Sequence, residues 1–268
     1  MIEKIQNFLY NTFVGRLILK PLVLPPVTKL SGLLLSTRLS SLYVNRFIES
    51  NNIDMSDYEN RRYCSFNDFF TRKILPGKRP VDSEPSSLIS PCDSALTVYD
   101  INDESVFFIK NSVYTVSELT GGDGGKYRGG KCLVFRLAVH NYHRYCFFDS
   151  GTAENPKKIK GVFHTVMPIS ESYKVFSRNS REVTLLHTDN FGDACQTEVG
   201  ALMVGKISNN PVRKFSRGDE KGMFEFGGST IVLLLEKDRA VIREDILNNS
   251  ENNIETPVKY GEKIGRSC

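Results

Sequence analysis

The residues best suited to chemistry lie in one short stretch of this 268-residue chain, Phe226-Gly227-Gly228-Ser229-Thr230. Two glycines precede a serine, and the apolar run that follows, Ile231–Leu235, is typical of a buried strand. One interpretation is a glycine-permitted turn or bulge at which Ser229 begins the strand. The other is a backbone cleavage site, because Ser229 Oγ could approach the Gly228 carbonyl where no Cβ atoms intervene. The stretch alone leaves both interpretations open.

A serine hydroxyl needs a base to become a nucleophile, and His143 is the candidate. It follows the predicted buried strand Cys132–Val139 at a strand end rich in Tyr and Arg. Alternation places His143 on one face with Asn141 and Tyr145. A lone histidine is more often structural, so the assignment depends on what else lies nearby.

The remaining histidines are weaker candidates. His164 and Tyr142 are predicted to line the substrate pocket, and His187 has no assigned role. No three of the four histidines have the spacing of a metal site, so no metal is predicted.

Asp93 is the candidate carboxylate, in a proline-containing turn just before the predicted strand Leu96–Ile101. An aspartate in such a turn most often caps its own backbone. The functional alternative is a carboxylate that orients a histidine.

The surrounding pattern predicts an α+β fold, with N-terminal helices followed by a mostly antiparallel β domain. Residues 54–70 predict a helix with aromatic side chains on its buried side, ended by the Pro and Gly residues of 76–80. From residue 94 onward, short apolar runs such as Val183–Leu186 and Gly200–Ile207 alternate with turn residues, as strands do. No Rossmann glycine fingerprint or phosphate-binding loop occurs.

Residues 1–48 form a distinct arm that is rich in apolar residues and punctuated by Lys and Arg. Its longest uncharged runs, Pro21–Thr28 and Leu30–Thr37, are too short to span a membrane. The arm is therefore expected either to pack on the domain or to lie in the bilayer interface with its basic residues near the headgroups.

Composition excludes several classes of protein. The net charge of +4 is too small and scattered to predict nucleic-acid binding, and 40% hydrophobic residues are typical of a globular chain. Six cysteines without paired spacing, and no recognisable signal peptide, predict reduced thiols in a reducing compartment.

Taken together and in this order, the motifs resemble phosphatidylserine decarboxylases, a pyruvoyl-dependent family. The resemblance covers roughly residues 50–265 and is specific in the Gly-Ser-Thr, Asp and Tyr-His-Arg motifs. The matching stretches are Phe69-Phe70-Thr71-Arg72, Ser90-Pro91-Cys92-Asp93-Ser94, Phe135-Arg136-Leu137, Tyr142-His143-Arg144, Phe163-His164-Thr165-Val166, Glu198-Val199-Gly200-Ala201, Glu220-Lys221-Gly222, Phe226-Gly227-Gly228-Ser229-Thr230 and Glu255-Thr256 with Lys259-Tyr260-Gly261-Glu262.

The resemblance implies self-cleavage at Gly228-Ser229 into a β chain (1–228) and an α chain (229–268), with Ser229 converted to a pyruvoyl group. A relay is implied in which Asp93 orients His143 and His143 activates Ser229. The pyruvoyl group would then form a Schiff base with phosphatidylserine and release CO2, leaving phosphatidylethanolamine, with His143 as proton donor. Because Ile231–Leu235 would be a central strand, the cut is not expected to release the α chain.

Two departures from the family pattern stand out. Many members carry a second histidine at the position of Cys146, which leaves His143 as the only base of that motif. The residue before the cleavage-site glycine is often bulky, whereas here it is Gly227, which is expected to loosen the turn without removing the chemistry.

The resemblance further implies a catalytic domain at 49–268, a heterodimer of its own two chains, and peripheral attachment to the cytoplasmic side of the cell membrane. Further oligomerisation, acyl-chain preference and any role of Cys92 or Cys146 are left open. Three alternatives remain: a serine hydrolase using Ser229, His143 and Asp93, a non-catalytic phospholipid-binding relative, and a decarboxylase of water-soluble amino acids.

Overall fold

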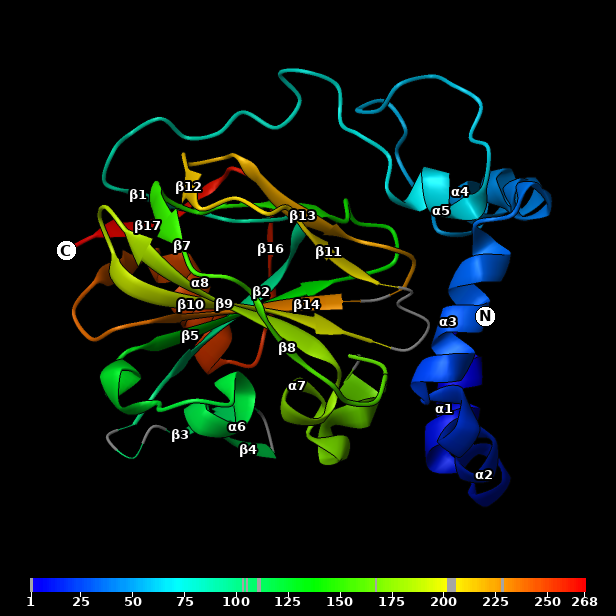
Figure 1. Cartoon of the computed structure of the whole chain (residues 1–268), viewed down its shortest axis with the longest axis horizontal. Coiled ribbons are helices and arrows are strands. Elements are labelled where there is room, and N and C mark those ends of the chain that lie inside the picture. The colour runs from blue at the N-terminus through cyan, green and yellow to red at the C-terminus, as the bar shows by residue number, and fades with distance from the viewer. Residues whose placement is uncertain are drawn as a thin grey trace.

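The N-terminal quarter of the chain is helical and lies along one side of a β body (Figure 1). The computed structural model describes residues 2–102, 104, 106–109, 112–166, 168–201, 206–227 and 229–268. The helices of this part are α1 (Ile2–Asn11), α2 (Phe13–Leu22), α3 (Pro25–Leu35), the 3-10 helix η1 (Arg38–Tyr43), α4 (Val44–Ser50) and α5 (Phe66–Phe70). A long segment then crosses the top of the body to the first strand.

The body is built on an antiparallel sheet of nine strands within the described residues. Its order is β12-β7-β9-β10-β14-β5-β2-β16, with β8 also paired to β9. The bounds are β12 (Lys214–Phe215), β7 (Gly151–Ala153), β9 (Arg181–Thr188), β10 (Gly192–Gly200), β14 (Ser229–Leu235), β5 (Lys131–Leu137), β2 (Ser94–Asp100), β16 (Thr256–Val258) and β8 (Lys157–Ile159). The predicted α+β class is confirmed.

Smaller elements cover both faces of this sheet. On one face lie the sheets β1-β17-β15 and β11-β13-β6 with α8, and on the other the hairpin β3-β4 with α6 and α7. Their bounds are β1 (Ser87–Ile89), β17 (Lys263–Ser267), β15 (Ala240–Ile242), β11 (Ile207–Asn209), β13 (Glu220–Phe224), β6 (Arg144–Cys146), α8 (Glu244–Glu251), β3 (Val106–Ile109), β4 (Ser112–Thr115), α6 (Val116–Thr120), η2 (Gly125–Tyr127), η3 (Pro168–Tyr173) and α7 (Val175–Arg178).

Because both faces are covered, β14 is buried along its whole length, as its unbroken apolar run predicts. Ile231, Leu233 and Leu235 enter the core under the small sheets, while Val232 and Leu234 enter the core under the helices.

Two local predictions are wrong. Within residues 54–70 only Phe66–Phe70 is helical, because Ser65 caps a helix that begins there and Tyr58 instead forms a β-bridge with Ile74. The predicted strand Gly200–Ile207 is not continuous: β10 ends at Gly200, β11 begins at Ile207, and residues 202–205 lie outside the described residues.

Candidate active site

The sheet register collects motifs that are far apart in the sequence at one end of neighbouring strands. Ser229 lies opposite Gly200 on β10 and opposite Leu137 on β5. On the next strand, β2, Ser94 continues the same row and lies opposite Val258 of β16. Neighbouring strands are about 4.8 Å apart. Ser229, the serine of the predicted cleavage site, and the residue after Asp93 are therefore only two strands apart.

Ser229 itself is fully buried, and its Oγ has no hydrogen-bond partner among the described residues. Gly227 has a φ of 133°, a conformation that residues with a Cβ rarely adopt. Gly228 lies outside the described residues. A buried, unpaired hydroxyl costs free energy, and Ser229 shares this state with other buried hydroxyls, among them those of Ser94 and Thr230.

His143 lies immediately before β6, which pairs with β13, the strand that precedes Ser229 in the chain. Its carbonyl accepts a hydrogen bond from Phe224 N at 2.9 Å, at the end of β13, five residues before Ser229. Its ring is fully buried against Phe70, with ring centroids 3.9 Å apart. Phe70 also packs against Phe226, whose centroid lies 5.1 Å from its own. The base candidate and the cleavage stretch therefore share one aromatic neighbour.

The hydrogen bonds of His143 define which nitrogen can accept a proton. Nδ1 lies 2.9 Å from the carbonyl oxygen of Asn141, and a carbonyl can only accept, so Nδ1 carries the hydrogen. Nε2 is then the basic atom, and it is buried without a hydrogen-bond partner among the described residues. Burial, assisted by the charge of Arg72, lowers the pKa of His143 to about 3, while the hydrogen bond to the backbone of Asn141 and, less, the backbone of Gly227 oppose this shift. The imidazole is therefore neutral at neutral pH.

Asp93 does not orient His143 through a hydrogen bond in the described structure. Arg79 donates from Nε to Asp93 Oδ1 (2.9 Å) and from Nη2 to Oδ2 (2.7 Å), and the backbone N of Tyr260 donates to Oδ1 (2.8 Å). Arg79 also bridges to Asp57 at 2.7 Å. The orienting contact of His143 comes from Asn141 instead, and the catalytic role of Asp93 stays a prediction.

The two predicted pocket residues lie in different surroundings. Tyr142 is buried between Tyr58 and Tyr260, at ring-centroid distances of 6.3 and 6.1 Å, and burial raises its pKa to about 12. His164 is buried beside Tyr10 of α1, and burial lowers its pKa to about 4. Their part in substrate binding stays a prediction.

The sequence did not indicate that two arginines, Arg79 and Arg72, contact the candidate site residues or their neighbours. Arg79 stood out only as part of a helix-ending segment, yet it neutralises Asp93. Arg72 is almost completely buried, donates to the carbonyl of His140 at 3.3 Å and lies 4.3 Å from the ring centroid of Tyr58. The signal was the density of Arg beside Tyr and Phe, which suits cation–π and carbonyl contacts.

A buried ion pair joins the small sheet to the main one on the face of Ser229. Lys221 of β13 donates to Glu198 of β10 at 2.8 Å and to Asn209 at the same distance. Both charged side chains are at most 3% exposed. This pair fixes β13, which leads directly to the cleavage stretch, against β10 beside Ser229.

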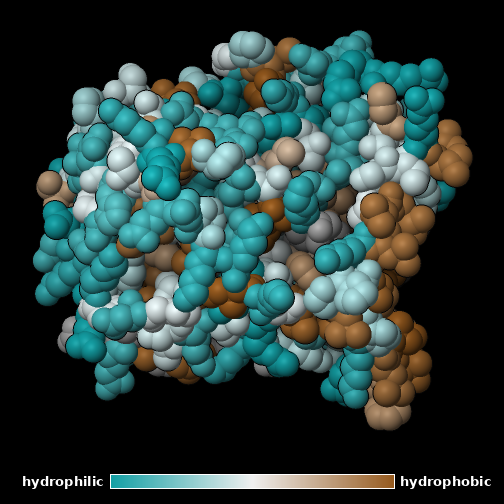
Figure 2. Space-filling model, viewed as in Figure 1, coloured by the Kyte–Doolittle hydropathy of each residue, from teal (hydrophilic) through white to brown (hydrophobic). Residues whose placement is uncertain are grey.

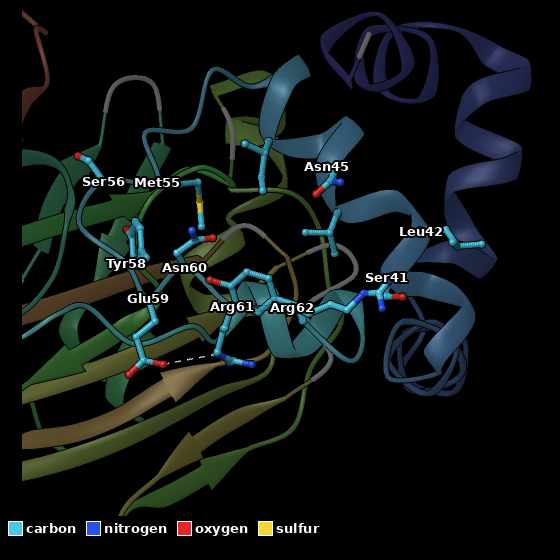
Figure 3. Close-up of a pocket in the computed structure, with 13 residues that line it drawn as sticks. Ser41, Leu42, Asn45, Met55, Ser56, Tyr58, Glu59, Asn60, Arg61 and Arg62 are labelled. Atoms are coloured by element: carbon cyan, nitrogen blue, oxygen red, sulfur yellow. Dashed lines mark ion pairs between the residues drawn. The ribbon is translucent and has the colours of Figure 1, made fainter.

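A pocket of about 660 Å3 opens between η1, α4 and the segment before α5 (Figure 3). Ser41, Asn45, Met55 and Arg62 are among its lining residues, and Tyr63 on its wall packs against Phe69 of α5. None of the predicted site residues lines it. Its lining contacts the predicted site residues through Tyr58, which packs against Tyr142.

Comparison with known proteins decides the family. The family model described as phosphatidylserine decarboxylase matches residues 66–266. The chain belongs to this family. It is 50% identical over 265 residues to "Phosphatidylserine decarboxylase proenzyme 2" of Clostridium acetobutylicum, covering 97% of this chain and 91% of the relative. It is also 41% identical to "Phosphatidylserine decarboxylase proenzyme" of Clostridium botulinum, over 98% of this chain and 92% of the relative. The relative from Ruminiclostridium cellulolyticum is 39% identical, over 98% and 91%.

Membership makes the chain an enzyme of the decarboxylase class, as the motifs predict. The match spans the β body and α5, and the relatives extend over the helical arm as well. The names of the relatives describe proenzymes, that is, precursors that require processing.

Proposed function

We propose that this protein cleaves itself at Gly228-Ser229 and then decarboxylates phosphatidylserine to phosphatidylethanolamine and CO2. The observation that carries the proposal is that two buried atoms without hydrogen-bond partners among the described residues, Ser229 Oγ and His143 Nε2, belong to segments that both pack against Phe70. One is a nucleophile and the other a base in its neutral form. Both lie in the core, where bulk water does not compete for the hydroxyl proton.

In the self-cleavage, His143 takes the proton of Ser229 Oγ as the oxygen attacks the Gly228 carbonyl. The C–O bond forms, the C–N bond breaks, and the proton passes to the freed amine of Ser229. Loss of the Ser229 Cα proton then forms a Cα–Cβ double bond and breaks the Cβ–O bond of the ester, leaving residues 1–228 with a C-terminal carboxylate. Hydrolysis at Cα releases the nitrogen as ammonia and leaves a carbonyl oxygen from water. The α chain therefore begins with a pyruvoyl group.

Ser229 fits as the source of this cofactor because its hydroxyl makes no hydrogen bond to the described residues that conversion would remove. The pyruvoyl group supplies a carbonyl that binds the substrate amine and accepts the electron pair left when CO2 departs. In this proposal His143 returns a proton to the product, and its contact with Phe70 and its full burial keep its ring out of water. Asp93, held by Arg79, supplies a fixed carboxylate at the same end of the sheet.

The proposal includes peripheral membrane attachment through the arm, on the cytoplasmic side of the cell membrane. Figure 2 shows hydrophobic side chains gathered along the helical side of the molecule. Leu33, Leu39 and Leu42 are 69–80% exposed, and Arg38 and Arg46 lie among them. No single described helix is long and apolar enough to cross a membrane, although α2 and α3 meet the length and composition criteria together with a 75° bend between them. Exposed apolar residues with interspersed arginines suit the bilayer interface.

The intact mass of the purified protein under denaturing conditions tests the chemistry. We expect two chains, the smaller beginning at residue 229 with a pyruvoyl group in place of serine. A single catalytically active chain of about 30 kDa would contradict the proposal and favour the hydrolase alternative. CO2 release from phosphatidylserine, compared with free serine, tests the substrate class.

A further inference from the structure

The first helix of the arm makes buried polar contacts with the segment Phe163-His164-Thr165. The hydroxyl of Tyr10 accepts a hydrogen bond from Thr165 N at 2.9 Å and lies 3.3 Å from His164 Nδ1. One turn earlier in α1, Gln6 Nε2 donates to Thr165 Oγ1 at 3.3 Å. Tyr10 is only 4% exposed, and its ring meets those of His164 and Tyr173 edge-on. α1 is therefore joined to the β body by more than apolar contact.

This segment lies directly against the strand row that contains Ser229. The ring of Phe163 packs so closely on Gly200 that a Cβ there would lie 3.0 Å from it. Asn179 Nδ2 donates to the carbonyls of both His164 and Gly200, at 2.8 Å each. Gly200 is the cross-strand partner of Ser229. Tyr10 is therefore connected to Ser229 through the segment Phe163-His164-Thr165 and the paired strands β10 and β14.

The opposite face of α1 points outward. Ile5 and Phe8 are 53% and 45% exposed, whereas Tyr10 and Leu9 are buried. One short helix therefore presents an apolar face to the surroundings and a polar contact to the site. Contact of that face with lipid would bear directly on the position of His164 and Thr165.

We propose that Tyr10 is a positioning residue for the decarboxylase site, and that α1 is a fixed wall of that site. This inference rests on the proposed function of Ser229. Tyr10 does not touch the reacting atoms. It holds the His164-Thr165 segment against Gly200, so that the substrate meets a formed wall beside Ser229.

The test compares Tyr10→Phe with Tyr43→Phe, a matched change at a tyrosine of the same arm that is 62% exposed. Tyr10→Phe keeps the ring contacts and removes only the hydroxyl. In the uncleaved Ser229→Ala protein, amide hydrogen exchange at Thr165 should speed up about tenfold in Tyr10→Phe and stay unchanged in Tyr43→Phe. Unchanged exchange at Thr165 would overturn the positioning role.

The second measurement uses the self-processing enzyme and dispersed short-chain phosphatidylserine. Tyr10→Phe should reach the same extent of processing as the wild type, with kcat/KM lowered about tenfold, mainly through KM. Wild-type kinetics in Tyr10→Phe would refute the inference while leaving the proposed function intact. A wild-type protein that stays in one chain and releases no CO2 would refute the proposed function, and the exchange measurement would still decide whether Tyr10 holds the segment.

Discussion

The strand β14 and the helix α3 are both strongly apolar, yet the protein uses them in opposite ways. Every residue of β14 is buried, and its side chains enter two cores. In α3 only Thr28 is buried, whereas Leu30, Leu33 and Leu34 are 58–69% exposed. The hydrophobic side chains of β14 are buried by other parts of the chain, and their packing fixes the register of the strands around Ser229. Those of α3 remain available for contact with something outside the chain.

The largest effect should come from Ser229→Ala, which removes the chemistry of the core strand without disturbing its packing. We expect complete loss of processing and of decarboxylation, because no nucleophile remains. Since Ser229 Oγ has no hydrogen-bond partner in the described structure, the thermal midpoint should not fall. Intact mass and calorimetry check both points. A cleaved Ser229→Ala protein would place the cut elsewhere.

Next in size is a direct comparison of one leucine from each region. In the Ser229→Ala background, Leu233→Ala should lower the free energy of unfolding by about 2–5 kcal/mol, since it leaves a cavity in the core. Leu33→Ala should change it by no more than about 0.5 kcal/mol, because that side chain is 69% exposed. Denaturant unfolding without lipid measures both. Equal costs would mean that α3 packs on the body in solution.

The third prediction concerns the pH dependence of folding stability, which should depend on histidines of the β body and not on the arm. His143 and His164 have pKa values lowered to about 3 and 4, whereas the unfolded chain titrates near 6.5. Below about pH 6.5 the unfolded state therefore binds more protons, and stability should fall by about 1.4 kcal/mol per pH unit for each histidine until the folded values are reached. Unfolding of Ser229→Ala as a function of pH measures this slope.

The matched control for the pH prediction is His143→Gln, also in Ser229→Ala, which should reduce the slope by about one histidine's share. An unchanged slope would contradict the assignment. Residues 1–48 contain no histidine, so vesicle binding by the arm should show no step attributable to histidine over the same pH range.

The smallest effect concerns the arm. The double change Leu33→Ser with Leu34→Ser should weaken binding to anionic phospholipid vesicles about tenfold, or about 1.4 kcal/mol, without lowering the thermal midpoint. Val241→Ser is the matched control, because Val241 is an exposed apolar residue of the body at 44%. Vesicle co-sedimentation measures the affinity. An equal loss in the control would argue against a specific role of the arm.

The parts of the fold that the sequence could predict are those set by local pattern. The unbroken apolar run after Ser229 requires a strand covered on both faces, and β14 is one. The prediction of a helix over 54–70 failed because aromatic spacing is compatible with helix and with loop alike. The capping of Phe66–Phe70 by Ser65 and the bridge of Tyr58 to Ile74 depend on contacts outside any short window.

The sequence provides candidate site residues, whose catalytic roles stay predictions, but not the hydrogen bonds that those residues make. Ser229, His143 and Asp93 are candidates by residue type and order. The structure places Ser229 and the residue after Asp93 at one end of the main sheet, and it places His143 beside β13, the strand that precedes Ser229. That Asp93 would bind Arg79, and that Asn141 would orient His143, follows from strand order and turn geometry. Neither can be read from a single sequence, since any of several arginines could have paired with Asp93.

The central position of β14 also determines whether the protein can refold after the proposed cut. Once the proposed cut is made, the chain 229–268 supplies the middle strand of the main sheet together with β15, β16 and β17. The larger chain alone would have to leave a gap between β10 and β5. Refolding would then require two molecules to meet, and its yield would depend on concentration. If the proposed cut occurs, the uncut chain would fold as one molecule only before cleavage, and the denatured mature enzyme should not readily refold.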